Sequence, residues 1–268
     1  MPFTLIPDSP LLPDIGPVQI HYRSCGEGIP LIFLHGGWGY EVYPFEHQIK
    51  AFAEKFSIII PDRSGYGRST KMYHFPINFH HCAAGEMIRF LDILEIPQAI
   101  LWGHSDGAVI AAIMGLQAPT RFLGLILEAF HYRRAKTSSV AFFQTMLNNP
   151  EQLGERVCTV MAREHGADYW RTVLANGGRV WLEIIKQSEQ GEKDFYNGQL
   201  SQLKVPTAFV HGSDDPRTEP GELADIGKQL PSATMLIIKG AGHSPHSERA
   251  WAAESSERAG EFLSGLVK

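Results

Sequence analysis

The sequence has 268 residues, of which 44% are hydrophobic and 20% are charged, and its formal net charge is −5. This composition predicts a globular protein long enough for one domain with an insertion. No long basic run is present, which argues against nucleic acid as a partner and leaves small molecules as the expected ligands.

Cysteine usage and hydropathy indicate where the chain acts. Cys25, Cys82 and Cys158 lie far apart and form no C-x-x-C pair, as is typical of proteins in a reducing compartment. Residues 1–8 lack a basic segment followed by a sustained apolar one, and no uncharged apolar stretch reaches about 18 residues. We therefore expect a cytoplasmic protein, monomer or homodimer, with no export signal and no membrane contact.

Apolar runs alternate with amphipathic helices in the first half of the chain. Residues 18–23 alternate in polarity and predict an edge strand of a hairpin, and residues 30–35 predict a buried strand. A helical stripe of apolar residues covers 45–56, and a second buried strand covers 56–61. Asp62 and Arg63 begin the glycine-rich loop that follows, where we expect them to brace the backbone by hydrogen bonds.

The same alternation continues to residue 127. A helical stripe over 83–94 precedes a strand at 99–102, and an apolar helix at 108–114 precedes a strand at 122–127. Because crossovers between parallel strands are right-handed, this order predicts a mostly parallel, doubly wound sheet covered on both faces.

The alternation stops near His131 and resumes near Pro206. Between these points no long β-branched run occurs, and the segment is expected to form helices. We therefore predict a core formed by residues 1–130 and 204–268, with an inserted helical cap at 131–203. Strands at 206–211 and 234–239 complete the sheet.

The stretch Gly103-His104-Ser105-Asp106-Gly107 lies where a buried strand turns into a buried helix. This is the setting of a nucleophile elbow, in which a tight turn exposes the serine and favours glycine on both sides. Reactive groups gather at the carboxyl ends of parallel strands, and three further strand ends carry residues 35–37, 212–215 and 240–243. A serine hydroxyl needs an imidazole as base and an acid to orient that imidazole. The order Ser105, Asp215, His243 supplies all three.

A tetrahedral oxyanion also requires preorganised donors. The backbone amides of Gly37 and Asp106 are the candidates for this oxyanion hole. Trp38 lies beside Gly37 and is a candidate substrate contact.

Together these motifs resemble the α/β-hydrolase superfamily. The resemblance rests on H-G-G at 35–37, D-x-x-G-x-G-x-S at 62–69, G-x-S-x-G at 103–107, G-x-x-D at 212–215 and G-H-S at 242–244. It implies an α/β-hydrolase fold with Ser105 as nucleophile, His243 as general base and then acid, and Asp215 as the orienting acid. Asp214 is the alternative for that acid. No cofactor and no metal are implied.

A serine at the elbow leaves ester, thioester, lactone, amide or carbon–carbon bond cleavage open. The expected activity is hydrolysis of a small carboxylic ester through an acyl-enzyme. The alternatives are hydrolysis of a carbon–carbon bond in a vinylogous diketone, and a receptor-like protein that binds a ligand with little turnover.

The residue after the elbow serine, Asp106, gives information on the charge of the substrate. It could bind a cationic substrate group, or it could simply favour the positive end of its helix. The Ser-Asp-Gly elbow, Asp168-Tyr169-Trp170 and G-x-x-D-P at 212–216 also resemble the valacyclovir hydrolase (biphenyl hydrolase-like) group, which implies an amine-bearing ester and makes Trp170 a candidate substrate contact.

The remaining histidines are assigned structural roles. His35 is expected to shape the oxyanion loop, and His104 to be structural. His80 and His81 have no carboxylate or cysteine at ligand spacing and are expected to face solvent, and the same is expected of His246.

Overall fold

One mixed sheet of eight strands organises the computed structural model, which describes residues 2–191 and 193–267. The strand order is β1-β2-β4-β3-β5-β6-β7-β8. In this spatial order, each pair of neighbouring strands from β4 through β3 to β8 is parallel. The strands β1 and β2 join the sheet in antiparallel pairs. The prediction of a mostly parallel, doubly wound sheet is confirmed.

The strands follow the apolar runs of the sequence. Every residue of β5 and β7 is buried, as expected for parallel strands covered on both faces. The bounds are β1 (Phe3–Ile6), β2 (Val18–Cys25), β3 (Ile29–Leu34), β4 (Phe56–Pro61), β5 (Ala99–His104), β6 (Phe122–Glu128), β7 (Thr207–Gly212) and β8 (Thr234–Ile238).

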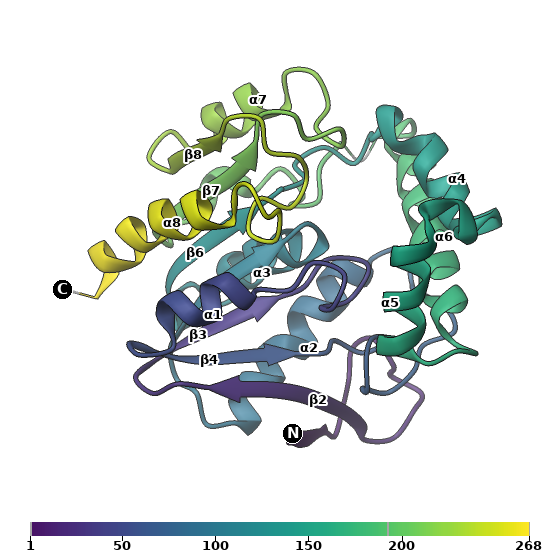
Figure 1. Ribbon diagram of the computed structural model, residues 1–268, viewed down its shortest axis with the longest axis horizontal. Coiled ribbons are helices and arrows are strands. Elements are labelled where there is room, and N and C mark those ends of the chain that lie inside the picture. The colour runs from purple at the N-terminus through teal and green to yellow at the C-terminus, as the bar shows by residue number, and fades with distance from the viewer. Residues whose placement is uncertain (1, 192, 268) are drawn as a thin grey trace.

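Helices cover both faces of the sheet (Figure 1). On one face α1 (Glu46–Phe52) packs beside α8 (Ala252–Leu266), and on the other α2 (Phe79–Ile93) packs beside α3 (Asp106–Gln117). The sheet thus separates two apolar clusters of buried side chains. The helix α7 (Glu222–Gln229) connects β7 to β8.

Three α-helices lie in the described part of the connection between β6 and β7, where the sequence predicted helices. They are α4 (Val140–Asn148), α5 (Glu155–His165) and α6 (Trp170–Ser188), and they stand together beyond one end of the sheet (Figure 1). We call α4–α6 the inserted helices; the predicted cap boundaries at 131 and 203 stay a prediction. No helix within residues 2–191 and 193–267 is long and apolar enough to cross a membrane.

The prediction that residues 18–23 form an edge strand was wrong. In the structure β2 lies between β1 and β4 and pairs with both. The edge is β1, which is only four residues long. Its length explains the error, because so short a run shows no clear alternation of polarity.

Candidate active site

Ser105 occupies a tight turn between β5 and α3. Its backbone has φ 55° and ψ −119°, a conformation that is strained for a residue with a side chain. A Cβ atom on Gly103 would lie 2.2 Å from the carbonyl oxygen of Gly107, and one on Gly107 would lie 2.1 Å from the carbonyl oxygen of Leu34. Both glycines are therefore required by close backbone approach, as the elbow motif predicted.

Three side chains from separate loops meet at this turn. The hydroxyl of Ser105 lies 3.0 Å from His243 Nε2, and His243 Nδ1 lies 2.9 Å and 3.0 Å from the two carboxylate oxygens of Asp215. Because a carboxylate only accepts, Nδ1 carries the proton and Nε2 is free to accept the hydrogen bond of the serine. This is the geometry needed for general-base activation of a hydroxyl.

The two aspartates that competed for the acid position are separated by the structure. Asp215 is buried beside His243, whereas Asp214 is exposed and accepts a hydrogen bond of 2.7 Å from the hydroxyl of Ser213. Asp215 also accepts a hydrogen bond of 2.9 Å from the backbone N–H of Arg217, which fixes the loop that carries it.

Burial and neighbouring charges set the protonation states of His243 and Asp215. Burial lowers the pKa of His243, the positive charge of Arg217 lowers it further, and Asp215 opposes both. Burial disfavours the charged form of Asp215, but the charge and hydrogen bond of His243 outweigh it and hold the pKa of that carboxyl well below its usual range. At neutral pH the imidazole is therefore a free base facing an ionised carboxylate.

Gly37, whose backbone N–H is one predicted oxyanion donor, lies against the side chain of Asp106, whose backbone N–H is the other. A Cβ atom on Gly37 would lie 2.6 Å from Asp106 Oδ2, and one on Gly36 would lie 3.2 Å from the Cβ of Ser105. The loop after β3 thus packs directly on the elbow. Asp106 is the first residue of α3, where a backbone N–H has no acceptor within its own helix.

The carboxylate of Asp106 is held by two neighbours that the sequence did not connect to it. Its Oδ1 lies 2.9 Å from His80 Nε2 and accepts a hydrogen bond of 3.2 Å from the indole of Trp181. The prediction that His80 faces solvent was wrong, because this ring is 2% exposed and packs between Phe79 and Phe195. His81 is partly buried and lies 2.9 Å from the carbonyl oxygen of Phe195.

A pocket opens above Ser105 between the sheet and the inserted helices. Its lining contains residues from the strand-end loops and from α4 and α6: Gly36, Gly37, Trp38, Tyr43, His104, Ser105, Asp106, His131, Phe142, Phe143, Met146, Gly177, Trp181, Arg217 and His243. Of the predicted substrate contacts, Trp38 and Asp106 line the pocket. Trp170 does not: it is buried at the start of α6, where the guanidinium of Arg171 lies over its ring.

A second imidazole that sequence reasoning missed lies beside the nucleophile. His131 Nε2 is 3.4 Å from the hydroxyl of Ser105, and its ring stacks on that of His243 at 5.7 Å. Burial lowers the pKa of His131 well below its ordinary value, so this ring is neutral. The available signal was its place just after the predicted strand at 122–127.

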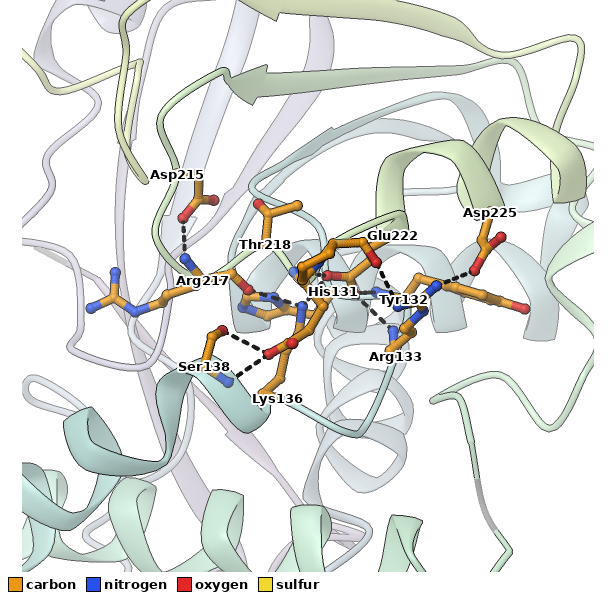
Figure 2. A network of polar contacts seen from close by, with 12 residues as sticks. His131, Tyr132, Arg133, Lys136, Ser138, Asp215, Arg217, Thr218, Glu222 and Asp225 are labelled. Carbon is orange, nitrogen blue, oxygen red and sulfur yellow. Dashed lines mark hydrogen bonds and ion pairs between the residues drawn. The ribbon is translucent and has the colours of Figure 1, made fainter.

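A buried ion pair ties the loop after β6 to the start of α7 (Figure 2). Lys136 Nζ lies 2.5 Å from a carboxylate oxygen of Glu222, and both side chains are 1% exposed. The other oxygen of Glu222 accepts hydrogen bonds of 2.9 Å from the backbone N–H groups of Tyr132 and Arg133. This pair therefore holds the segment that follows His131.

Three further predictions concern Arg63, which was expected to brace a loop, His104, which was expected to be structural, and His246. Arg63 donates to the carbonyl oxygens of His35 and Gly36, and His104 Nε2 lies 3.1 Å from the carbonyl oxygen of His243. His246 was predicted to face solvent, which was wrong: it is fully buried, and its Nδ1 lies 2.8 Å from Glu128.

Comparison with known proteins defines the class. The family model described as alpha/beta hydrolase fold matches residues 29–250. The chain belongs to this family, and the resemblance inferred from its motifs is confirmed.

Individual relatives are distant. Serine hydrolase BPHL of Homo sapiens is 23% identical over 92% of this chain and 83% of its own length. A pimeloyl-[acyl-carrier protein] methyl ester esterase of Yersinia enterocolitica is 33% identical over 85% of this chain and 91% of its own. A solved structure of a thermophilic esterase from Thermogutta terrifontis superposes with a TM-score of 0.74 at 18% identity, covering 99% of each chain.

Proposed function

We propose that this protein is a serine hydrolase that cleaves a small carboxylic ester through an acyl-enzyme. The observation that carries the proposal is the continuous chain of contacts from Ser105 through His243 to Asp215. The esterase among its relatives supports an ester as the substrate class.

The first half of the reaction forms the acyl-enzyme. His243 Nε2 takes the proton of the Ser105 hydroxyl as its oxygen attacks the ester carbonyl carbon. The backbone N–H groups of Gly37 and Asp106 stabilise the resulting oxyanion. As the tetrahedral intermediate collapses, His243 returns the proton to the leaving alcohol.

The second half releases the acid. Water gives a proton to His243 and attacks the acyl carbon, and the new tetrahedral intermediate expels the oxygen of Ser105, which regains its proton from the imidazole. Asp215 keeps the imidazole in one tautomer throughout and stabilises its positive charge. The products are a carboxylic acid and an alcohol.

Labelling with a fluorophosphonate probe tests the nucleophile. We expect the wild-type protein to be labelled and to hydrolyse short 4-nitrophenyl esters, and Ser105→Ala to lose both properties. Ser264→Ala, an exposed serine at the far end of α8, is the matched control and should behave like wild type. A folded wild-type protein that is neither labelled nor active would overturn the proposal.

Within the ester class, the contacts of Asp106 favour a plain carboxylic ester over an amine-bearing one. One oxygen of this carboxylate is already bound by His80 and Trp181. A substrate ammonium would compete with these neighbours for the same charge. Kinetics of wild type and Asp106→Asn on amino-acid esters and plain esters test this: we expect similar losses on both, whereas a selective loss on amino-acid esters would favour the amine-bearing substrate.

A further inference from the structure

Arg217 reaches the pocket from the same loop as Asp215. Its backbone is fixed at two points, because its N–H donates to Asp215 Oδ1 at 2.9 Å and its carbonyl oxygen accepts a hydrogen bond of 3.1 Å from Lys136 Nζ. The side chain points away from the ion-paired groups of the Lys136–Glu222 network (Figure 2). It lines the pocket together with Ser105 and His243.

The guanidinium of Arg217 lies on aromatic surfaces instead of pairing with an acid. Its centre is 3.9 Å from the ring centroid of Phe142 and 6.0 Å from that of Trp38. Within the described residues, its side chain forms no hydrogen bond and no ion pair. By contrast, Arg63 donates to two backbone carbonyl oxygens, those of His35 and Gly36.

A partly buried guanidinium without a hydrogen-bond acceptor is costly, because removal from water weakens its hydration and contact with aromatic rings offsets only part of that loss. Its planar set of N–H donors matches the two oxygens of a carboxylate, which it can bind in a bidentate manner. The Phe142 ring supports the guanidinium from one side, and an aromatic ring face takes up none of its N–H groups in a conventional hydrogen bond. The acidic side chain that also lines the pocket, Asp106, is already engaged by His80 and Trp181.

We propose that Arg217 is a specificity-determining residue that binds a carboxylate on the substrate, so that the preferred ester carries a second, ionised acid group. The preference among esters that this inference predicts rests on the proposed esterase function. The binding of a carboxylate by the pocket does not require the nucleophile and can be measured separately.

Two matched pairs of substrates test the proposal. In one pair the acyl chain carries the group, 4-nitrophenyl hydrogen glutarate against its terminal carboxamide; in the other the leaving group carries it, 4-acetoxybenzoate against 4-acetoxybenzamide. We expect wild type to prefer the carboxylate in one pair by about tenfold or more in kcat/KM, the effect of a charged hydrogen bond. Equal kcat/KM within both pairs would overturn the proposal.

Variants of the arginine assign the preference to it. In Arg217→Gln the ratio of carboxylate to carboxamide should fall to within about threefold of unity, and Arg217→Lys should retain an intermediate ratio because its charge lacks the planar donor set. Arg171→Gln removes an arginine that is paired with Glu151 outside the pocket, and it should keep the wild-type ratio. A wild-type ratio in Arg217→Gln would overturn the proposal.

A binding measurement separates this inference from the esterase proposal. Titration of glutarate and glutaramide into Ser105→Ala by calorimetry should show tighter binding of the diacid, lost when Arg217→Gln is added. If wild type hydrolyses no ester but this difference is found, the carboxylate site stands and the esterase assignment fails. If esters are hydrolysed but neither the diacid nor the charged esters are preferred, the carboxylate site fails alone.

Discussion

Replacing Lys136 by methionine should destabilise the protein strongly, because it leaves a carboxylate buried without its cation. Lys136 and Glu222 are each 1% exposed and pair at 2.5 Å. Removal of one partner of a buried pair costs about 3–5 kcal/mol. Glu222 would keep hydrogen bonds from three backbone N–H groups, those of Tyr132, Arg133 and Glu219, which places the expected loss near the lower end, about 3 kcal/mol.

Equilibrium unfolding in urea, followed by tryptophan fluorescence, measures this loss in the free energy of unfolding. A thermal melt should show a fall in Tm of about 5 °C. Arg133→Gln is the matched control, because it removes a positive charge from the partly exposed ion pair with Asp225 and should shift stability much less. A loss below about 1 kcal/mol in Lys136→Met would refute the reasoning.

A double-mutant cycle with Glu222→Gln separates the ion pair from side-chain packing. The carboxamide still accepts backbone hydrogen bonds but carries no charge. We expect the lysine substitution to cost about 1–3 kcal/mol less in the Glu222→Gln background. An equal cost in both backgrounds would show that packing of the lysine stem, and not its charge, is what stabilises this region.

Three further predictions concern pH and backbone geometry. Because the pKa of His243 is lowered, its neutral form persists below pH 6.5, and kcat/KM should stay high as pH falls to that value and decline only below it, as a pH–rate profile would measure. Burial raises the pKa of Glu164 to about 7 from 4.5, so the stability that its protonated form provides is fully present below about pH 4.5 and is lost as pH rises through 7; relative to Glu164→Gln, wild type should lose up to about 3 kcal/mol across this window in urea titrations. Gly103→Ala should destabilise the protein or prevent folding, because the new methyl group would lie 2.2 Å from the carbonyl oxygen of Gly107, and thermal melts measure the loss.

Each of these predictions has an outcome that contradicts it. A half-maximal kcat/KM at pH 7 or above would contradict the lowered pKa of His243. Parallel pH–stability curves for wild type and Glu164→Gln would contradict the raised pKa of Glu164. Gly265→Ala provides the control for Gly103, since a Cβ there meets no atom within 4 Å; equal Tm values for the two alanine variants would contradict the steric argument.

The sequence predicted the sheet, and the loops whose side chains meet at Ser105, because their signals are local. The run from Ala99 to Trp102 is apolar at every position, and the glycines around Ser105 mark a turn so tight that the backbone leaves no room for a Cβ atom. The proximity of Ser105, Asp215 and His243 then follows from a general rule: parallel strands bring their carboxyl ends to one edge of the sheet.

Contacts between segments distant in sequence could not be predicted in this way. His80 begins a helix, and nothing nearby indicates that Trp181 and Phe195 will enclose it. His246 is likewise buried by Glu128 and Phe45, which come from other parts of the chain. Trp170 was favoured as a pocket residue by a short motif, but the helix turns it elsewhere and Trp181 lines the pocket.

The residues that line the pocket come from two separate parts of the chain. Phe142, Met146 and Trp181 all come from one uninterrupted stretch of polypeptide, whereas Ser105, His243 and Arg217 lie outside it. A chimera that receives α4–α6 from a relative would therefore acquire a differently shaped pocket in a single exchange and keep Ser105, Asp215 and His243. Phe142, which contacts the guanidinium of Arg217, would be exchanged with the helices. Such a chimera has to preserve the hydrogen bond from the indole of Trp181 to Asp106, which joins α6 to the elbow.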